Sequence, residues 1–221
     1  NEALGCYQQT LRLQPGFADA HYSMGNLMRD QGNFDAAEQC YRQAVQHDPN
    51  MAAAHYFLGN MLRTQSRVEE AVASYESALR INPDFPEAYW NKLRVLPVIY
   101  DSQDQVDYYR RKYADGLREL GEKLSLGTPQ ARTSALRGAI ASTNFYLQYQ
   151  GLDDLLLQKQ YGALIHGIMT AGFPQWALKL DMPPMSANGK IRVGYASAFL
   201  RSHNGAVWLL GWLRHRNREE F

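Results

Sequence analysis

The chain has 221 residues, of which 45% are hydrophobic and 20% are charged, so it carries enough apolar surface for a core and is not a wholly disordered protein. Its 23 basic and 22 acidic side chains give a net charge of +1, which excludes a strongly electrostatic nucleic-acid or membrane binder. No apolar run approaches the ~20 residues that a membrane-spanning helix needs.

Residues of the same type recur every 34 positions in the first part of the chain. This period is typical of the tetratricopeptide repeat (TPR), a pair of helices that stacks on its neighbours. Glycines let the two helices of a pair approach closely, tyrosines fill the space between repeats, and each proline ends a second helix. The recurring positions are Ala3, Ala37 and Ala71; Tyr7, Tyr41 and Tyr75; Pro15, Pro49 and Pro83; and Gly25 with Gly59.

The period and its apolar pattern predict a TPR α-solenoid of about 2.5–3.5 units over residues 1–97. The stack is the folding unit, because one helix pair does not bury its own apolar face. The helices are expected near residues 3–13, 18–31, 34–47, 52–65, 68–81 and 86–95.

Cysteines and histidines also follow the repeat. Cys6 and Cys40 occupy equivalent places, and because repeats stack ~10 Å apart whereas a disulfide needs Cα atoms within ~7 Å, we predict reduced thiols in a reducing compartment, the cytoplasm. His21 and His55 recur with the same period, but a metal would need two further ligands at closer spacing. We interpret them as packing residues, and we predict no metal and no cofactor-binding residue in the chain.

The first helix of each pair lines the concave face of a TPR stack, so equivalent residues of successive repeats on these helices should form a groove. Spacings of three and four place the candidates on one stripe of each helix. Aromatic side chains offer flat contact area, and each asparagine carries a donor and an acceptor suited to an extended peptide backbone. A solvated face with incidental polar repeats is the alternative. The predicted groove residues are Tyr22, Asn26 and Arg29; Tyr56, Asn60 and Arg63; and Trp90 with Arg94.

The repeat period is lost after Pro97. Apolar residues at helical spacing predict helices at 101–121, 129–142 and 153–171, with Ser102 as a cap of the first. Residues 98–181 are therefore interpreted as a helical connecting region, and prolines and glycine at 181–189 mark a linker.

The segment KIRVGYAS at residues 190–197 is short and alternating, and it contains the strand-forming residues Ile191, Val193 and Tyr195. It predicts the first strand of an open α/β sheet, followed by a helix at 206–215. Ligands of such sheets bind just beyond the strand ends, which makes 197–205 a candidate site. His203 is the group there that can move protons near neutral pH, although a loop histidine is more often structural than catalytic.

TPR units followed by this strand, by His203 and then by Asn217 and Phe221 resemble the O-linked N-acetylglucosamine transferase / SPINDLY family. The segments LPVIY at 96–100 and TNFYLQYQG at 143–151 are similar to its bacterial, especially cyanobacterial, members. The chain departs from the family at residues 199–202, where Phe-Leu-Arg-Ser replaces an Asp-Phe-Gly-Asn run, and at Val207, which replaces a second histidine.

The resemblance implies a protein O-glycosyltransferase that moves N-acetylglucosamine from UDP-N-acetylglucosamine, or fucose from GDP-fucose, onto serine or threonine. It implies a metal-free catalytic part of two Rossmann-like lobes (GT-B), the first beginning within residues 182–221, with His203 as proton acceptor. The TPR groove would hold the acceptor protein. The family's nucleotide-binding residues lie beyond Phe221, so we expect a fragment that transfers no sugar alone. The alternative is a non-catalytic TPR scaffold for protein–protein interaction.

Overall fold

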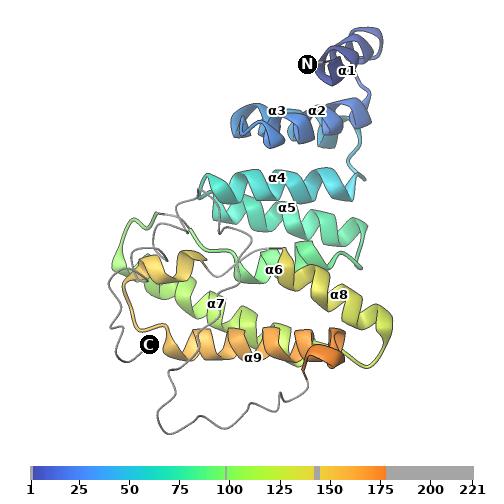
Figure 1. The fold of residues 1–221 in the computed structure, drawn as a ribbon. Helices are drawn as coiled ribbons and strands as arrows, with labels where there is room; N and C mark the ends of the chain where they lie inside the picture. The colour runs from blue at the N-terminus through green and yellow to red at the C-terminus, as the bar shows by residue number, and fades with distance from the viewer. Residues whose placement is uncertain (1, 98, 142–144, 178–221) are drawn as a thin grey trace, which may run out of the picture. The chain divides into compact units, whose positions relative to one another are not determined.

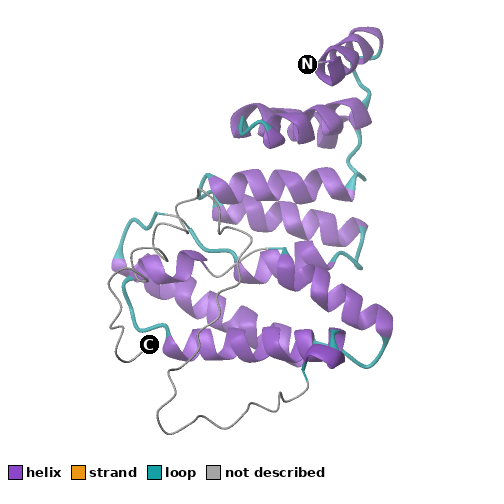
Figure 2. Ribbon diagram, in the orientation of Figure 1, coloured by secondary structure: helices purple, strands orange, loops and turns teal. Residues whose placement is uncertain are grey.

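The computed structural model describes residues 2–97, 99–141 and 145–177, and this part of the chain is built of helices and loops without a strand (Figure 2). Residues Asn1–Ala177 form one compact unit. The predicted strand at 190–197, the helix at 206–215 and His203 lie outside the described residues, so the β-α unit of a Rossmann-like lobe stays a prediction.

Six helices follow the repeat period, and the sequence prediction of each is confirmed to within one residue at either end (Figure 1). The helix α1 packs on α2, α2 pairs with α3, and α4 pairs with α5, while α3 contacts α4 and α5 contacts α6. The stack is therefore the continuous solenoid that the repeat predicts. The bounds are Glu2–Leu13 for α1, Ala18–Asp30 for α2, Phe34–His47 for α3, Ala52–Thr64 for α4, Val68–Ile81 for α5 and Pro86–Arg94 for α6.

The glycine and the tyrosine of each repeat are packed against one another. A Cβ atom added at Gly25 would lie 2.7 Å from the ring of Tyr41, and one added at Gly59 would lie 2.7 Å from the ring of Tyr75. Both tyrosines are fully buried. Glycine is therefore needed on the first helix because the ring from the second helix occupies the space of a side chain.

In each of the two regular repeats, one histidine on the first helix contacts the loop that precedes that helix. His21 Nε2 lies 2.8 Å from the carbonyl oxygen of Pro15, and His55 Nε2 lies 3.0 Å from that of Pro49. His21 also stacks on His47, with ring centroids 5.4 Å apart. These contacts give both histidines a structural role in the loop.

Charged side chains cross from the first repeat to the second. Arg67 donates to Glu38 at 2.8 Å and to Glu70 at 2.6 Å, and Arg42 donates to Glu38 at 2.7 Å. Burial raises the pKa of Glu38, but hydrogen bonds from Arg42 and Arg67 outweigh it and hold that pKa below its ordinary value. Glu38 is therefore ionised at neutral pH and links α3 to the loop before α5.

The pair formed by α6 and α7 (Gln103–Lys123) departs from the two repeats before it. Leu93 stands where those repeats have glycine, and the close approach has moved to Gly116 on α7, where any Cβ would overlap the Leu93 backbone. Ser102 caps α7 as predicted, because its side chain accepts from the Gln105 N–H at 3.2 Å. The change of glycine from one helix to the other explains why the sequence period ends here.

Two further helices complete the unit. The helix α8 packs on α6, and α9 packs on α8 and α7. Their shared core holds Trp90, Leu120, Ala135, Leu164 and Ile168. A short 3₁₀ helix at 145–150 was not predicted, because its aromatic and amide-rich sequence has no helical periodicity. The bounds are Gln103–Lys123 for α7, Pro129–Ile140 for α8, Phe145–Gln150 for η1, Leu155–Gly172 for α9 and Pro174–Trp176 for η2.

The two cysteines are free thiols. Cys40 is buried in α3 and Cys6 is exposed on α1. Cys6 is exposed because α1 packs mainly on α2 among the described helices. No helix among the described residues is long and apolar enough to span a bilayer.

We predict that Gly59→Ala lowers the free energy of unfolding by about 1–3 kcal/mol, because the new methyl group overlaps the Tyr75 ring and the buried pair must move apart. Gly121→Ala is the matched control, since Gly121 lies inside α7 and nothing lies within 4 Å of an added Cβ. That change should stabilise by about 0.5–1 kcal/mol, as alanine does in an open helix. Urea unfolding followed by circular dichroism measures both, and equal midpoints for the two variants would contradict the packing argument.

Candidate functional site

The candidate groove lies on α2 and α4, the first helices of the two regular repeats. Its residues stand at the same positions of each helix, one repeat period apart. They comprise an aromatic residue, an asparagine one turn later and an arginine a further turn on. In the structure these are Tyr22, Asn26 and Arg29 on α2, and Tyr56, Asn60 and Arg63 on α4.

Each asparagine is bound by the tyrosine that covers the glycine of its repeat. The Tyr41 hydroxyl donates to Asn26 Oδ1 at 2.9 Å, and the Tyr75 hydroxyl donates to Asn60 Oδ1 at 2.8 Å. Burial raises the pKa of Tyr41 to about 12 and raises that of Tyr75 as well. Both hydroxyls therefore stay protonated at neutral pH and remain donors.

The oxygen of each asparagine takes a second hydrogen bond. Asn26 Oδ1 also accepts from Arg29 at 3.2 Å, and Asn60 Oδ1 also accepts from Asn91 at 3.2 Å. A carbonyl oxygen has two lone pairs, so both acceptors are used within the protein. The Nδ2 groups of Asn26 and Asn60 have no hydrogen-bond partner among the described residues and are the free donors of the groove.

The aromatic residues of the groove are more deeply packed than the sequence suggests. Tyr22 is half-buried, with its ring centroid 6.0 Å from those of Tyr41 and Phe57. Tyr56 is only 9% exposed and packs on Phe85, with centroids 4.8 Å apart. Tyr22 thus presents part of its ring, whereas Tyr56 belongs mainly to the core.

Phe57 and Asn91 are site residues that the sequence reasoning missed. Phe57 stacks on Tyr41 at 5.8 Å, and the Arg29 guanidinium lies 4.6 Å from its ring centroid. Asn91 is buried and donates to Asn60, and its own Oδ1 has no partner among the described residues. These two positions are one repeat period apart and align with Ser23, so the change of residue type hides them from a search for repeats.

The third pair of predicted groove residues is covered by the protein itself. Trp90 is 3% exposed and Arg94 is 6% exposed. The helix α8 lies over Trp90, because a methyl group at Gly138 would overlap the indole. The Arg94 guanidinium lies 5.0 Å from the Trp90 ring and 5.5 Å from that of Tyr161 on α9. Trp90 and Arg94 are therefore core residues here, and the open part of the stripe ends with α4.

An ion pair holds α8 over the third repeat. Arg137 on α8 donates two hydrogen bonds to Glu87 on α6, at 2.8 and 3.0 Å. Glu87 occupies the position that Asp19 has in the first repeat. The surface that a partner would meet on an open repeat is thus occupied on α6 by a helix of the same chain.

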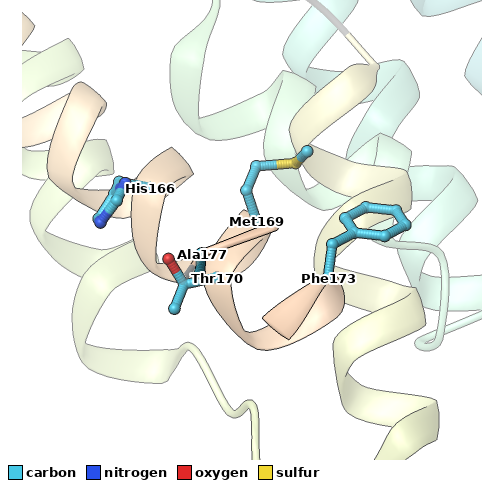
Figure 3. A pocket seen from close by; sticks show the side chains of 5 residues that line it. All are labelled: His166, Met169, Thr170, Phe173 and Ala177. Atoms are coloured by element: carbon cyan, nitrogen blue, oxygen red, sulfur yellow. The ribbon is translucent and has the colours of Figure 1, made fainter. Parts of the chain in front are cut away.

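A separate hollow of about 360 Å³ lies at the end of α9. Figure 3 shows His166 and Phe173 on different sides of it, with Met169 and Thr170 between them; Ala177 completes the lining. His166 is the one titratable group among these five residues. Among all described residues, no three histidine, cysteine or acidic side chains come together as a metal would need. The described lining of the hollow thus contains no paired acid and base, and His203 lies outside the described residues.

Comparison with known proteins supports the helical-repeat assignment. The "Tetratricopeptide repeat" family model matches residues 22–86, which span α2 to the start of α6. No curated protein matches the sequence. The TPR assignment therefore stands for this segment of the chain.

Solved structures with a similar fold include MamA, at a TM-score of 0.50 and 18% identity over 79% of this chain and 90% of that chain. An O-GlcNAc transferase variant from Thermobaculum terrenum matches at a TM-score of 0.40 and 28% identity, over 52% of this chain and 23% of that chain. YrrB, described as a TPR protein with an unusual peptide-binding site, matches at a TM-score of 0.40 and 17% identity, over 77% of this chain and 82% of that chain. The likeness to MamA concerns the helical fold alone.

Proposed function

We propose that the α2–α4 face binds an extended segment of a partner protein through the side-chain amides of Asn26 and Asn60. The observation that carries this proposal is the pair of hydrogen bonds from Tyr41 and Tyr75. They use the amide oxygens inside the protein and leave both Nδ2 groups as fixed donors on the same stripe.

The donors suit the carbonyl oxygens of an extended backbone. A helix satisfies its own carbonyls except in its last turn, whereas an extended segment has carbonyl oxygens free to accept. Binding through the backbone is tolerant of partner sequence, and contacts with side chains then supply the preference. The asparagine side chains are already held by buried tyrosines, so little conformational entropy is lost when a partner binds to them.

Replacing both asparagines by aspartate tests the donor role. Asn26→Asp and Asn60→Asp keep an oxygen acceptor for each tyrosine but remove the N–H donor. We expect the double variant to stay folded and to bind peptides about tenfold or more weakly, the effect of losing one or two hydrogen bonds. The probes are peptides selected from a displayed random library on the wild-type chain, and fluorescence anisotropy measures their affinity.

The matched control is Gln43→Ala with Gln46→Ala, two exposed positions on α3 that bond to each other. This pair should leave the affinity unchanged. Peptides that bind the aspartate variant as tightly as the wild type would refute the proposal, and so would a library that yields no binder.

The second proposal concerns the parent protein, and its support is the sequence resemblance of residues 143–221 to the O-linked N-acetylglucosamine transferase / SPINDLY family. In that setting the TPR face holds an acceptor protein, and His203 takes the proton of its serine or threonine hydroxyl. A scaffold without chemistry accounts for the described residues equally well, because what they carry is a binding surface.

Sugar transfer by the full-length parent separates these two functions. With UDP-N-acetylglucosamine or GDP-fucose as donor, a transferase should label an acceptor protein, and His203→Ala should lower that labelling at least about 100-fold, as loss of a general base does. Arg80→Gln, a change at an exposed residue on α5, is the control and should leave the labelling unchanged. Absence of labelling with either donor in folded parent protein favours the scaffold.

A further inference from the structure

The arginines of the two open repeats occupy equivalent positions but have different neighbours. Arg29 is followed by Asp30, whereas Arg63, at the same position of the next repeat, is followed by Thr64. Arg29 donates to the Asp30 carboxylate from Nε at 3.0 Å and from Nη2 at 2.8 Å. The first repeat therefore supplies a carboxylate for its own arginine.

The second repeat supplies no such group. The Thr64 hydroxyl donates to the Met61 carbonyl oxygen at 2.7 Å and carries no charge. No ion pair joins Arg63 to an acidic side chain among the described residues, and its Nε is buried without a hydrogen-bond partner. Arg63 is thus a half-buried cation whose counterpart in the first repeat is paired with a carboxylate.

Two groups close to Arg63, Tyr75 and Arg94, supply it with no negative charge at neutral pH. Burial raises the pKa of Tyr75 while the nearby Arg63 cation lowers it. Burial lowers the pKa of Arg94, and Arg63 lowers it further because both groups are positive. Asn60, one turn before Arg63 on α4, is held by Tyr75 and contributes its free amide donor to the same surface.

We infer that Arg63 binds the side-chain carboxylate of an aspartate or glutamate in the partner segment that lies along Asn26 and Asn60. The inference rests on the proposed function, and it adds a chemical preference to it. A guanidinium and a carboxylate form charge-assisted, often two-pronged hydrogen bonds. The partner's carboxylate would neutralise Arg63 as Asp30 neutralises Arg29, but through the terminal Nη groups, because the Nε of Arg63 is buried.

The occupant is an acidic side chain because the chain itself shows that group at the equivalent arginine. The open stripe consists of the exposed positions on α2 and α4. On α2 the arginine is already paired with Asp30, and beyond α4 the next repeat is covered by α8. One acidic position in the partner is therefore expected, placed near Arg63.

The test uses the full 221-residue chain and peptides selected on it from a displayed random library. An enriched peptide is compared with an analogue in which its aspartate or glutamate is replaced by the amide. The analogue should bind the wild-type chain about tenfold more weakly, the usual effect of losing a charge-assisted hydrogen bond. Arg63→Gln should bind both peptides equally.

A reciprocal exchange between repeats sharpens the test. Thr64→Asp gives Arg63 a carboxylate within the chain, as Asp30 does for Arg29, and should also abolish the preference for the acidic peptide. Arg80→Gln, an exposed arginine on α5 that bonds to Ser77, is the charge-matched control and should keep the preference.

Several results would overturn the inference. Peptides that depend on Asn26 and Asn60 but show no acidic preference refute the role of Arg63 and leave the proposed function standing. A preference that is lost only when the peptide's C-terminus is amidated assigns the site to a terminal carboxylate instead. Peptides that do not depend on the asparagines refute the proposed function and this inference together.

Discussion

The contact between a glycine on the first helix and a tyrosine on the second is the constraint on which the rest of the structure depends. At Gly25 and Gly59 the absent side chain makes room for the rings of Tyr41 and Tyr75. The ring that packs the two helices also carries the hydroxyl that reaches Asn26 or Asn60. Core packing and the orientation of groove side chains are thus properties of the same residue, so each regular repeat presents one amide donor in a fixed direction.

Where this contact is absent, the surface is used differently. Leu93 replaces the glycine on α6, and Gly116 on α7 provides the close approach instead. The stripe of α6 is then covered by α8, with Gly138 against Trp90 and Arg137 bonded to Glu87. Two repeats present an open stripe, and the third uses its stripe to attach the remaining helices.

The sequence predicts the six repeat helices because glycine, tyrosine and proline recur with the repeat period, for packing reasons shared by the regular repeats. It also places Asn26 and Asn60 on one stripe. It does not show that Trp90 and Arg94 are covered, because that depends on where α8 packs, and no period links Gly138 to Trp90. Phe57 is missed for the opposite reason, since its counterparts in the neighbouring repeats, Ser23 and Asn91, differ from it in kind.

The central claim is that the tyrosine hydroxyls fix the asparagine amides for a partner backbone. The most direct measurement is a calorimetric titration of an asparagine-dependent peptide into the wild-type chain and into Tyr41→Phe with Tyr75→Phe, which keep the rings over the glycines but remove both hydroxyls. The account predicts a folded variant that binds about tenfold more weakly, because each amide then loses one of the two hydrogen bonds that orient it and keeps only the weaker one from Arg29 or Asn91. An unchanged affinity in a folded variant would contradict it.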